Sequence, residues 1–294
     1  MYIGCLFAFN LFVWIYLYGY AYLLSTNLLS MPEKTMEYTD VKTGDQLNVL
    51  KYNLLMKPEK GCMTSTFLII FIHVRAGDEE SRRVIRETWP DENISKPYKL
   101  FFMTGTEPNL NLTQELLQHQ DLIQYDFIDS FQNLTLKTIA CLQFAMQYCA
   151  SAKYFLKVDT DVSVYLPSLI SLLEEKQPKR TVYGKLILNE PVQRNGKWAV
   201  SKDMIDFDTY PDYVGGSCYM ITMDLAADLL VAADETKPWW PVEDAFVTGH
   251  LREMCGGLIL GVERWLNRMH CSEQLRAIEP LCRINNNVEM FQVL

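Results

Sequence analysis

The sequence predicts an α/β protein in which helices flank a mostly parallel central sheet. Between residues 66 and 175, apolar runs rich in β-branched and aromatic residues alternate with helix-spaced segments. This order is typical of parallel strands joined by crossover helices. The apolar runs are also continuous rather than alternating with polar residues, as expected of strands that are buried on both faces.

The first half of this stretch contains two predicted strands and two predicted helices. TFLIIFIHV (66–74) and KLFFMT (99–104) are apolar runs of strand length. ESRRVIRETW (80–89) has apolar residues at helical spacing, and LTQELLQH (112–119) is predicted to be a short helix.

The second half repeats the alternation. DLIQYDF (121–127) and KYFLKV (153–158) are predicted strands. NLTLKTIACLQFAMQYCA (133–150) is predicted to be a long amphipathic helix, and LPSLISLLEE (166–175) a further helix with proline in its first turn. Ligands of open α/β sheets bind beyond the carboxyl ends of the strands, so residues that directly follow a strand are candidate site residues.

Composition sets the broad class of protein. The chain has 294 residues, of which 49% are hydrophobic and 21% charged, so it can bury a sizeable core and is not expected to be disordered. The net charge of −9 argues against a nucleic-acid-binding protein, which needs a basic surface to displace counterions.

The N-terminal segment is predicted to be a membrane anchor. Residues 3–24 contain no charged side chain, and a helix of this length can cross a hydrocarbon core of about 30 Å. A cleaved signal peptide is the alternative, but its apolar region is shorter and ends in small residues. The predicted organisation is a cytoplasmic tip and signal anchor over 1–24, a polar stem over 25–60 and a large luminal domain over 61–294.

Two further features indicate a secretory compartment. Asn-X-Ser/Thr sequons at Asn93, Asn111 and Asn133 are candidate glycosylation sites. Of the eight cysteines, all but Cys5 follow the apolar segment, and an oxidising lumen would pair some of them while leaving at least one unpaired.

Asp159 and Asp161 follow the predicted strand at 153–158 and either close a turn or hold a cation. An EF-hand is excluded, because its required glycine and glutamate positions hold Val164 and Ile170. Two carboxylates with open coordination instead suit Mg²⁺ or Mn²⁺ shared with the phosphates of a substrate. The second Asp-x-Asp triplet, Asp206 to Asp208, follows no strand and is interpreted as a solvated loop.

Arg82 and Arg86 lie four residues apart and therefore on one face of a helix. They form either a solvated basic face or a guanidinium pair that binds phosphate oxygens. Glu243 and Asp244 follow the aromatic pair at 239–240. One of them is a candidate general base, and Asp244 is also placed to cap a helix that begins after it.

Other site chemistries are disfavoured. The sequence contains no HExxH or CxxC motif for zinc, no G-x-S-x-G elbow and no P-loop. It also lacks the histidine and carboxylate cluster that a two-metal phosphodiesterase would need.

The chain resembles the β-1,3-galactosyltransferase family of Golgi enzymes over about residues 66–282. Five segments match family motifs in the family's order. RRVIRETW (82–89) is similar to R-x-A-I-R-x-T-W, and DFIDSFQNLTLKT (126–138) is similar to D-F-x-D-S-Y-x-N-L-T-L-K-T. FLKVDTDV (155–162) resembles K-x-D-D-D-V, and VEDAFVTG (242–249) resembles E-D-V-F-x-x-G. KWAVS (197–201) followed by YPDYVGGSCYMIT (210–222) is similar to K-W-x-V-S followed by Y-P-x-Y-x-x-G-x-G-Y.

The resemblance implies a type II Golgi membrane enzyme with a GT-A-like, nucleotide-sugar-binding sandwich. Such enzymes transfer a hexose from a UDP-sugar to a hydroxyl of an acceptor glycan with inversion, using Mn²⁺ or Mg²⁺. A β-1,3 linkage and galactose are expected here. In this role the tryptophans at 239–240 would pack against the apolar face of the acceptor sugar.

The resemblance also implies roles for individual residues. Asp161 would chelate the metal, and Asp159 would reach the ribose or a metal-bound water. Asp244, beside Glu243, would be the base. Arg82 and Arg86 would line the donor pocket. Tyr213 and Gly216 would shape the space for the sugar, and Thr160 would lie near the donor sugar.

Several positions depart from the family motifs, among them residues 160, 218 and 245. Thr160 replaces the middle aspartate near the donor sugar, Cys218 replaces a glycine, and Ala245 replaces a valine. None of them removes a group that the chemistry requires. The substitution at Thr160 keeps open an alternative, in which the chain is an inactive relative that binds glycans or serves as a partner subunit.

Overall fold

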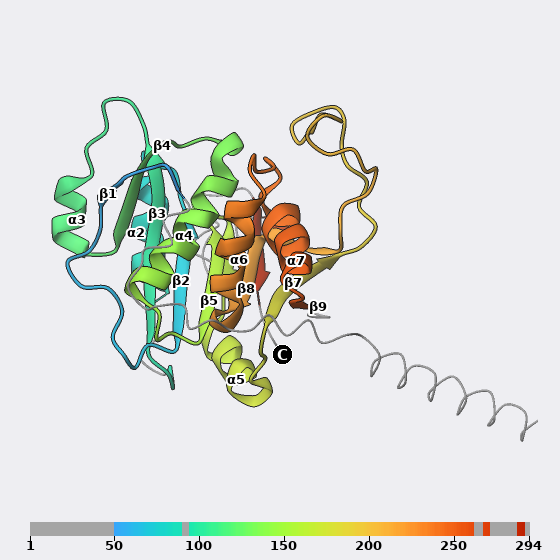
Figure 1. The fold of residues 1–294 in the computed structure, drawn as a ribbon. Helices are drawn as coiled ribbons and strands as arrows, with labels where there is room; N and C mark the ends of the chain where they lie inside the picture. Colours follow the sequence, from blue (N-terminus) through green and yellow to red (C-terminus); the bar gives the residue numbers. More distant parts are fainter. Residues whose placement is uncertain (1–49, 90–93, 262–266, 271–286, 292–294) are drawn as a thin grey trace, which may run out of the picture. The chain divides into compact units, whose positions relative to one another are not determined.

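The computed structural model describes residues 50–89, 94–261, 267–270 and 287–291. Its main sheet has eight strands in the order β1-β4-β3-β2-β5-β8-β7-β9 (Figure 1). The strands span Leu54–Met56 (β1), Leu68–His73 (β2), Tyr98–Thr106 (β3), Leu122–Ile128 (β4), Tyr154–Asp159 (β5), Thr181–Ile187 (β7), Tyr213–Thr222 (β8) and Leu258–Gly261 (β9).

Helices connect and cover these strands. They span Glu79–Thr88 (α2), Thr113–His119 (α3), Leu134–Tyr148 (α4), Leu166–Lys176 (α5), Met223–Glu235 (α6) and Arg252–Met254 (α7), with a 3₁₀ turn at Phe131–Asn133 (η1) and a π-helix at Ala245–Leu251 (η2). Every strand and helix expected between residues 66 and 175 is present, with small shifts at the ends. Strands β4, β3, β2 and β5 are mutually parallel, which confirms the predicted α/β class.

Strand β2 shows how the core is divided. All six of its residues are buried, because helices cover both faces of the sheet. Ile69 and Phe71 pack in the core that contains α4 and α6, which lie over one face in Figure 1. Ile70 and Ile72 point to the opposite face and pack in the core that contains α2 and α5.

The later part of the sheet is antiparallel. Strand β8 pairs antiparallel with both β5 and β7, so the start of β8 lies beside the carboxyl end of β5. A second sheet consists of β6 (Val162–Val164), β11 (Asn287–Phe291) and β10 (Asn267–His270). Strand β11 runs parallel to β6 and thus lies beside the chain directly after Asp161.

The expected stem requires a correction at its C-terminal end. Strand β1, inside the stretch 25–60 assigned to the stem, pairs antiparallel with β4, and Leu50 is buried in the core. These residues belong to the compact unit Gln46–Leu294. The strand was not predicted because its apolar run, Leu-Leu-Met, is only three residues long and lies in an otherwise polar stretch.

The expected anchor at 1–24 lies outside the described residues. Within the ranges that the structure describes, no helix is both long enough and apolar enough to cross a membrane. A disulfide joins Cys62, ahead of β2, to Cys149 at the end of α4. This bond confirms the expectation that some of the cysteines pair.

Candidate active site

A pocket of about 340 Å³ lies beyond the carboxyl end of β5. Strand β5, the start of β8, the start of η2 and the loop between β7 and β8 all contribute to its wall. The residues that line it are Leu134, Lys157, Asp159, Glu190, Gln193, Trp198, Tyr210, Tyr213, Gly216, Ser217, Val242, Glu243 and Asp244. Five of the expected site residues, Asp159, Tyr213, Gly216, Glu243 and Asp244, are therefore together in one pocket.

Strand β5 delivers two charged side chains to the pocket. Lys157 and Asp159 are two residues apart and so point to the same face of the strand. The Lys157 ammonium is buried and donates to Asp159 Oδ1 at 2.6 Å and to the carbonyl of Gly216. Burial alone would lower the pKa of Lys157. The negative charges of Asp159, Glu243 and Asp244 have the larger, opposite effect and raise this pKa above its ordinary value. Lys157 therefore stays charged.

Asp244 is placed at the start of η2 and faces the start of β8. Its Oδ2 accepts from the backbone N–H of Gly216 at 2.8 Å, and its Oδ1 accepts from the N–H of Ala245 at 2.9 Å. Burial raises the pKa of Asp244, and these two backbone donors oppose the rise. A Cβ at position 216 would lie 3.0 Å from Asp244 Oδ2, so any larger residue there would force this carboxylate to shift by a few tenths of an ångström.

Glu243 is more enclosed than its neighbour. Its Oε1 accepts from Thr138 Oγ1 of α4 at 2.6 Å and from the Tyr219 hydroxyl of β8. Burial raises the pKa of Glu243 to about 7, against the charge of Lys157. Glu243 thus ties η2 to α4 and β8, whereas Asp244 is half-buried and more open to the pocket.

The strand-end carboxylates fit a divalent cation that shares its coordination with a substrate. Asp159 has a side chain that is 37% exposed, and Thr160 and Asp161 are half-buried in the turn that leads to β6. Among the described residues, no group of three or more His, Cys, Asp or Glu side chains could hold a metal by itself. Mg²⁺ is commonly bound by one or two carboxylates together with substrate phosphates, and such a donor set matches this turn.

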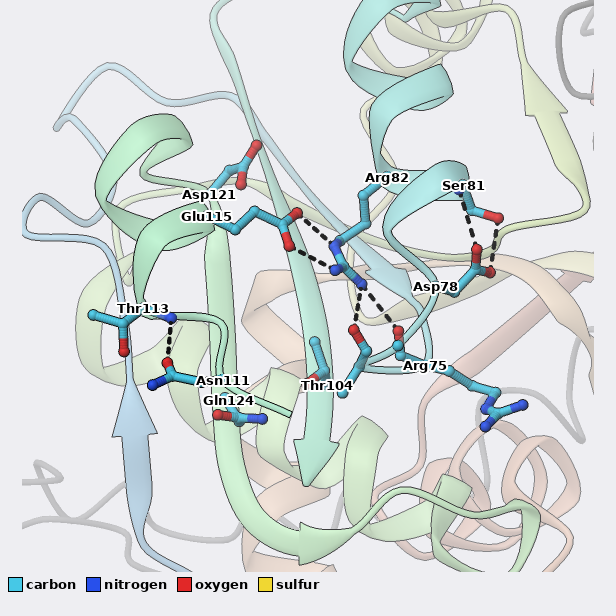
Figure 2. Close-up of polar contacts among 12 residues, drawn as sticks. Arg75, Asp78, Ser81, Arg82, Thr104, Asn111, Thr113, Glu115, Asp121 and Gln124 are labelled. Carbon is cyan, nitrogen blue, oxygen red and sulfur yellow. Dashed lines mark hydrogen bonds and ion pairs between the residues drawn. The ribbon is translucent and has the colours of Figure 1, made fainter. Parts of the chain in front are cut away.

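Arg82 lies in a different environment from the pocket (Figure 2). Its guanidinium donates to both carboxylate oxygens of Glu115 on α3, at 2.7 and 2.6 Å. The remaining nitrogen donates to the carbonyls of Arg75 and Ala76, each at 3.0 Å. The side chain is only 1% exposed. It therefore holds the loop after β2 rather than forming a solvated basic face.

Arg86 belongs to the same network. It donates to both oxygens of Asp121, at 2.7 and 2.8 Å, and pairs with Glu115 at 2.8 Å. Its guanidinium also lies 4.8 Å from the centre of the Phe102 ring. A diphosphate would have to displace these carboxylates, so the geometry does not support the expected donor contact of Arg82 and Arg86.

The Galactosyltransferase family model matches residues 80–256, which include both the arginine network and the pocket. The chain belongs to the galactosyltransferase family. Beta-1,3-galactosyltransferase 5 of Pan paniscus is 34% identical over 205 residues, which cover 66% of this chain and 68% of the relative. Beta-1,3-galactosyltransferase 1 of Mus musculus is 30% identical over 254 residues, covering 77% and 78%.

Likeness to solved structures is lower. A 4-diphosphocytidyl-2C-methyl-D-erythritol synthase has 12% identity and a TM-score of 0.41, over 74% of this chain and 98% of that one. That value is too low to bear on fold or function. Membership of the galactosyltransferase family makes the chain a glycosyltransferase.

The other residues singled out in the sequence lie away from the pocket or outside the described residues. Asp206 and Asp208 are exposed in the loop between β7 and β8, as expected of a solvated triplet. Asn111 is exposed, whereas the Asn133 amide donates to the carbonyl of Ile128 at 2.7 Å at the start of α4. Asn93 lies outside the described residues.

Sequence reasoning missed Lys157 as a residue of this pocket. A signal was present, because a lysine inside an otherwise apolar strand shares its face with the residue two positions on. It also missed Trp198 and Tyr219, one lining the pocket and the other donating to Glu243. Tyr219 carried no local signal, because its partner lies on a distant segment.

Proposed function

We propose that this chain is a metal-dependent, inverting hexosyltransferase. It transfers a hexose from a UDP-sugar to a hydroxyl group of an acceptor glycan and forms a β-1,3 linkage. Galactose is the proposed sugar, in line with the names of the relatives. The observation that carries this proposal is the pocket, which holds both Asp159 at the end of β5 and Asp244 at the start of η2.

The reaction needs two kinds of group. The acceptor oxygen attacks the anomeric carbon as the bond from that carbon to the phosphate oxygen breaks, and UDP leaves with the electron pair. Asp244 accepts the proton of the acceptor hydroxyl during the attack. Such base assistance contributes about 10²–10⁴-fold in rate. Lys157 keeps Asp159 oriented, and the Gly216 N–H keeps Asp244 oriented.

Asp161, assisted by Asp159, would hold Mn²⁺ or Mg²⁺ together with the diphosphate. When bound, the metal would offset the negative charge that develops on the departing UDP. Thr160, between these aspartates, would lie near the donor sugar. Tyr213 and Gly216 line the pocket and would shape the space for that sugar.

A second function rests on Thr160. This residue stands where the family motif has an aspartate, and it keeps open an inactive relative that binds glycans or serves as a partner subunit. Hydrolysis of UDP-galactose, UDP-N-acetylglucosamine or UDP-N-acetylgalactosamine in the presence of Mn²⁺ separates the two functions. An inactive relative would release no UDP from any of these donors.

Calorimetry and transfer assays on three variants test the proposed roles. Asp161→Ala should abolish the Mn²⁺-dependent part of UDP binding. Asp208→Ala is the matched control at the other triplet, since its side chain is 85% exposed, and it should leave binding intact. Asp244→Asn should leave UDP binding within a few-fold and lower transfer by about 10²-fold or more. Equal losses for Asp161→Ala and Asp208→Ala would refute the metal site, and near wild-type transfer by Asp244→Asn would refute the base.

We also propose that the chain is a single-pass type II protein of the Golgi membrane with a luminal catalytic domain. The uncharged segment at 3–24, the sequons and the Cys62–Cys149 disulfide support this location. Glycosidase digestion of the chain expressed in secretory cells should lower its apparent mass, and Asn111→Gln should remove part of that shift. A chain without any glycan would contradict the topology.

A further inference from the structure

The two adjacent tryptophans that the sequence offered for the acceptor sugar are not the aromatic groups of the pocket. Trp240 is 6% exposed and stacks on His250, with 4.4 Å between ring centres. Trp239 is half-buried and donates from Nε1 to the carbonyl of Ala233 at 2.6 Å. Among the described residues, the tryptophan that lines the pocket is Trp198.

Trp198 is presented by a well-braced loop between β7 and β8, which extends from the sheet in Figure 1. An Asn-Gly turn precedes it, and Gly196 has φ +87°, a conformation that favours glycine. Arg194 braces the loop by donating to three of its carbonyls, those of Val200 at 3.1 Å, Ile205 at 2.9 Å and Phe207 at 2.6 Å. The loop that carries Trp198 is thus held by hydrogen bonds within itself.

Two neighbours support the Trp198 ring at the rim of the pocket. Phe131, from the turn after β4, meets it edge to face with 6.1 Å between ring centres. The Lys197 ammonium lies 3.6 Å from the centre of the Phe131 ring and 4.7 Å from that of Trp198. Phe131 is 57% exposed. It also stands where the family motif has tyrosine, so this chain has a rim without that hydroxyl group.

We propose that Trp198 is the surface on which the acceptor sugar packs its apolar face, and that Phe131 and Lys197 set which acceptor fits. This inference rests on the proposed transferase function and adds the acceptor subsite to it. A hexose ring has an apolar C–H face that packs well on an aromatic ring, and binding pockets combine such surfaces with a few polar groups. Asp244 lies in the same pocket, and Glu190 and Gln193 of the loop provide hydrogen-bonding groups for the sugar hydroxyls.

Kinetics with simple acceptors test the assignment. The probes are p-nitrophenyl β-glycosides of galactose, N-acetylglucosamine and N-acetylgalactosamine, with each UDP-sugar and Mn²⁺. Trp198→Ala should raise the acceptor KM by about tenfold or more, while the donor KM and UDP affinity stay within a few-fold. Trp198→Phe keeps an aromatic face and should recover part of the loss. Tyr52→Ala is the matched control, because Tyr52 makes a similar edge contact with Phe127 on another surface.

The rim residues have their own test. Phe131→Tyr restores the hydroxyl of the family motif, and Lys197→Gln removes the ammonium. Each should change the ratio of KM values among the three glycosides, without changing UDP affinity. Saturation-transfer NMR of the same glycosides, with UDP and Mn²⁺ present, measures sugar binding independently of turnover.

The outcomes are distinct. An unchanged acceptor KM in both Trp198 variants, or failure of every glycoside to bind the wild-type chain, overturns the acceptor subsite and leaves the transferase proposal standing. Equal losses of UDP and glycoside binding in Trp198→Ala would also overturn it, by placing Trp198 on the donor side. Failure of the wild-type chain to bind UDP with Mn²⁺ overturns the transferase proposal instead.

Discussion

Glu243 shows how burial changes a single residue of the pocket. The carboxyl is 5% exposed and accepts from Thr138 and Tyr219, while Lys157 and Asp244 supply the nearby charges. Burial raises its pKa to about 7, well above the ordinary value of about 4.3. Between about pH 4.3 and pH 7, the Glu243 carboxyl is therefore mostly protonated in the folded chain and mostly ionised in the unfolded chain.

This difference predicts a pH-dependent stability. As the pH rises from about 4 to 7, the free energy of unfolding should fall through Glu243 by at most about 1.4 kcal/mol per pH unit, and level off above pH 7. Glu243→Gln should remove this pH dependence. The free energy of unfolding of the variant, measured relative to wild type, should therefore increase as the pH rises from about 4 to 7. Urea unfolding at pH 5, 6, 7 and 8 measures the difference.

A surface variant provides the reference for this measurement. Glu175 is 70% exposed, and Glu175→Gln should follow the wild-type profile at every pH. If Glu243→Gln also ran parallel to wild type, the carboxyl would not hold its proton in the folded chain.

Gly216 is a second residue whose role can be tested separately. Gly216→Ala would place a Cβ 3.0 Å from Asp244 Oδ2 and displace the carboxylate, so transfer should fall by about tenfold or more. Gly215→Ala is the matched control, since its Cβ would meet Ile187 Cδ1 at an ordinary 3.6 Å. Transfer assays on both variants measure the effect. Equal activities would show that the position of Asp244 is unimportant.

At the scale of elements, buried cations hold the loop after β2. Arg82 of α2 donates to the carbonyls of Arg75 and Ala76, and Lys137 of α4 donates to that of Val74 at 3.0 Å. Lys137 is itself paired with Asp129 at 2.7 Å. Three successive carbonyls at the carboxyl end of β2 are thus fixed by helices from opposite faces of the sheet.

Removal of the Arg82 guanidinium should therefore destabilise the domain. Arg82→Met leaves Glu115 short of a partner and removes the donor to the buried carbonyl of Ala76 and the partly buried carbonyl of Arg75. The free energy of unfolding should therefore fall by about 3–5 kcal/mol. Arg83→Met, one residue along the same helix, removes two exposed ion pairs, with Glu80 and Glu87, and should have little effect. Urea unfolding of the two variants measures both values. Similar small losses would mean that the network does not stabilise the fold.

At the scale of the whole molecule, a disulfide closes a long segment of chain. Cys62 and Cys149 are 87 residues apart, and the bond encloses β2, α2, β3, α3, β4 and α4. Cross-linking a long loop restricts the unfolded chain more than the folded one. The closed loop contains three of the four parallel strands, β2, β3 and β4, and the bond therefore stabilises this part of the sheet.

Loss of this bond should be measurable. Cys62→Ser with Cys149→Ser should lower the free energy of unfolding by about 2–5 kcal/mol. Cys255→Ser is the control, because Cys255 forms no disulfide with another cysteine of the described ranges. Urea unfolding, with alkylation of unreduced protein to confirm the bond, measures the effect. Equal stabilities of the double variant and the control would contradict it.

The sequence by itself determined the parallel half of the fold and the position of two key carboxylates. Continuous apolar runs and helical spacing are local properties, so strands such as β2 and β5 were predictable from the residues that form them. Asp159 was predictable as a site residue because it ends a buried strand. Asp244 was identified through a motif, which identifies a residue without showing its surroundings.

Only the tertiary structure decided what the charged and aromatic side chains contact. Arg82 binds Glu115, which is 33 residues away, and Thr138 binds Glu243, which is 105 residues away. Whether a guanidinium meets a phosphate or a carboxylate depends on such distant partners, and no local pattern contains them. The same reason explains why Trp240 is buried against His250, whereas Trp198 lines the pocket that also contains Asp244.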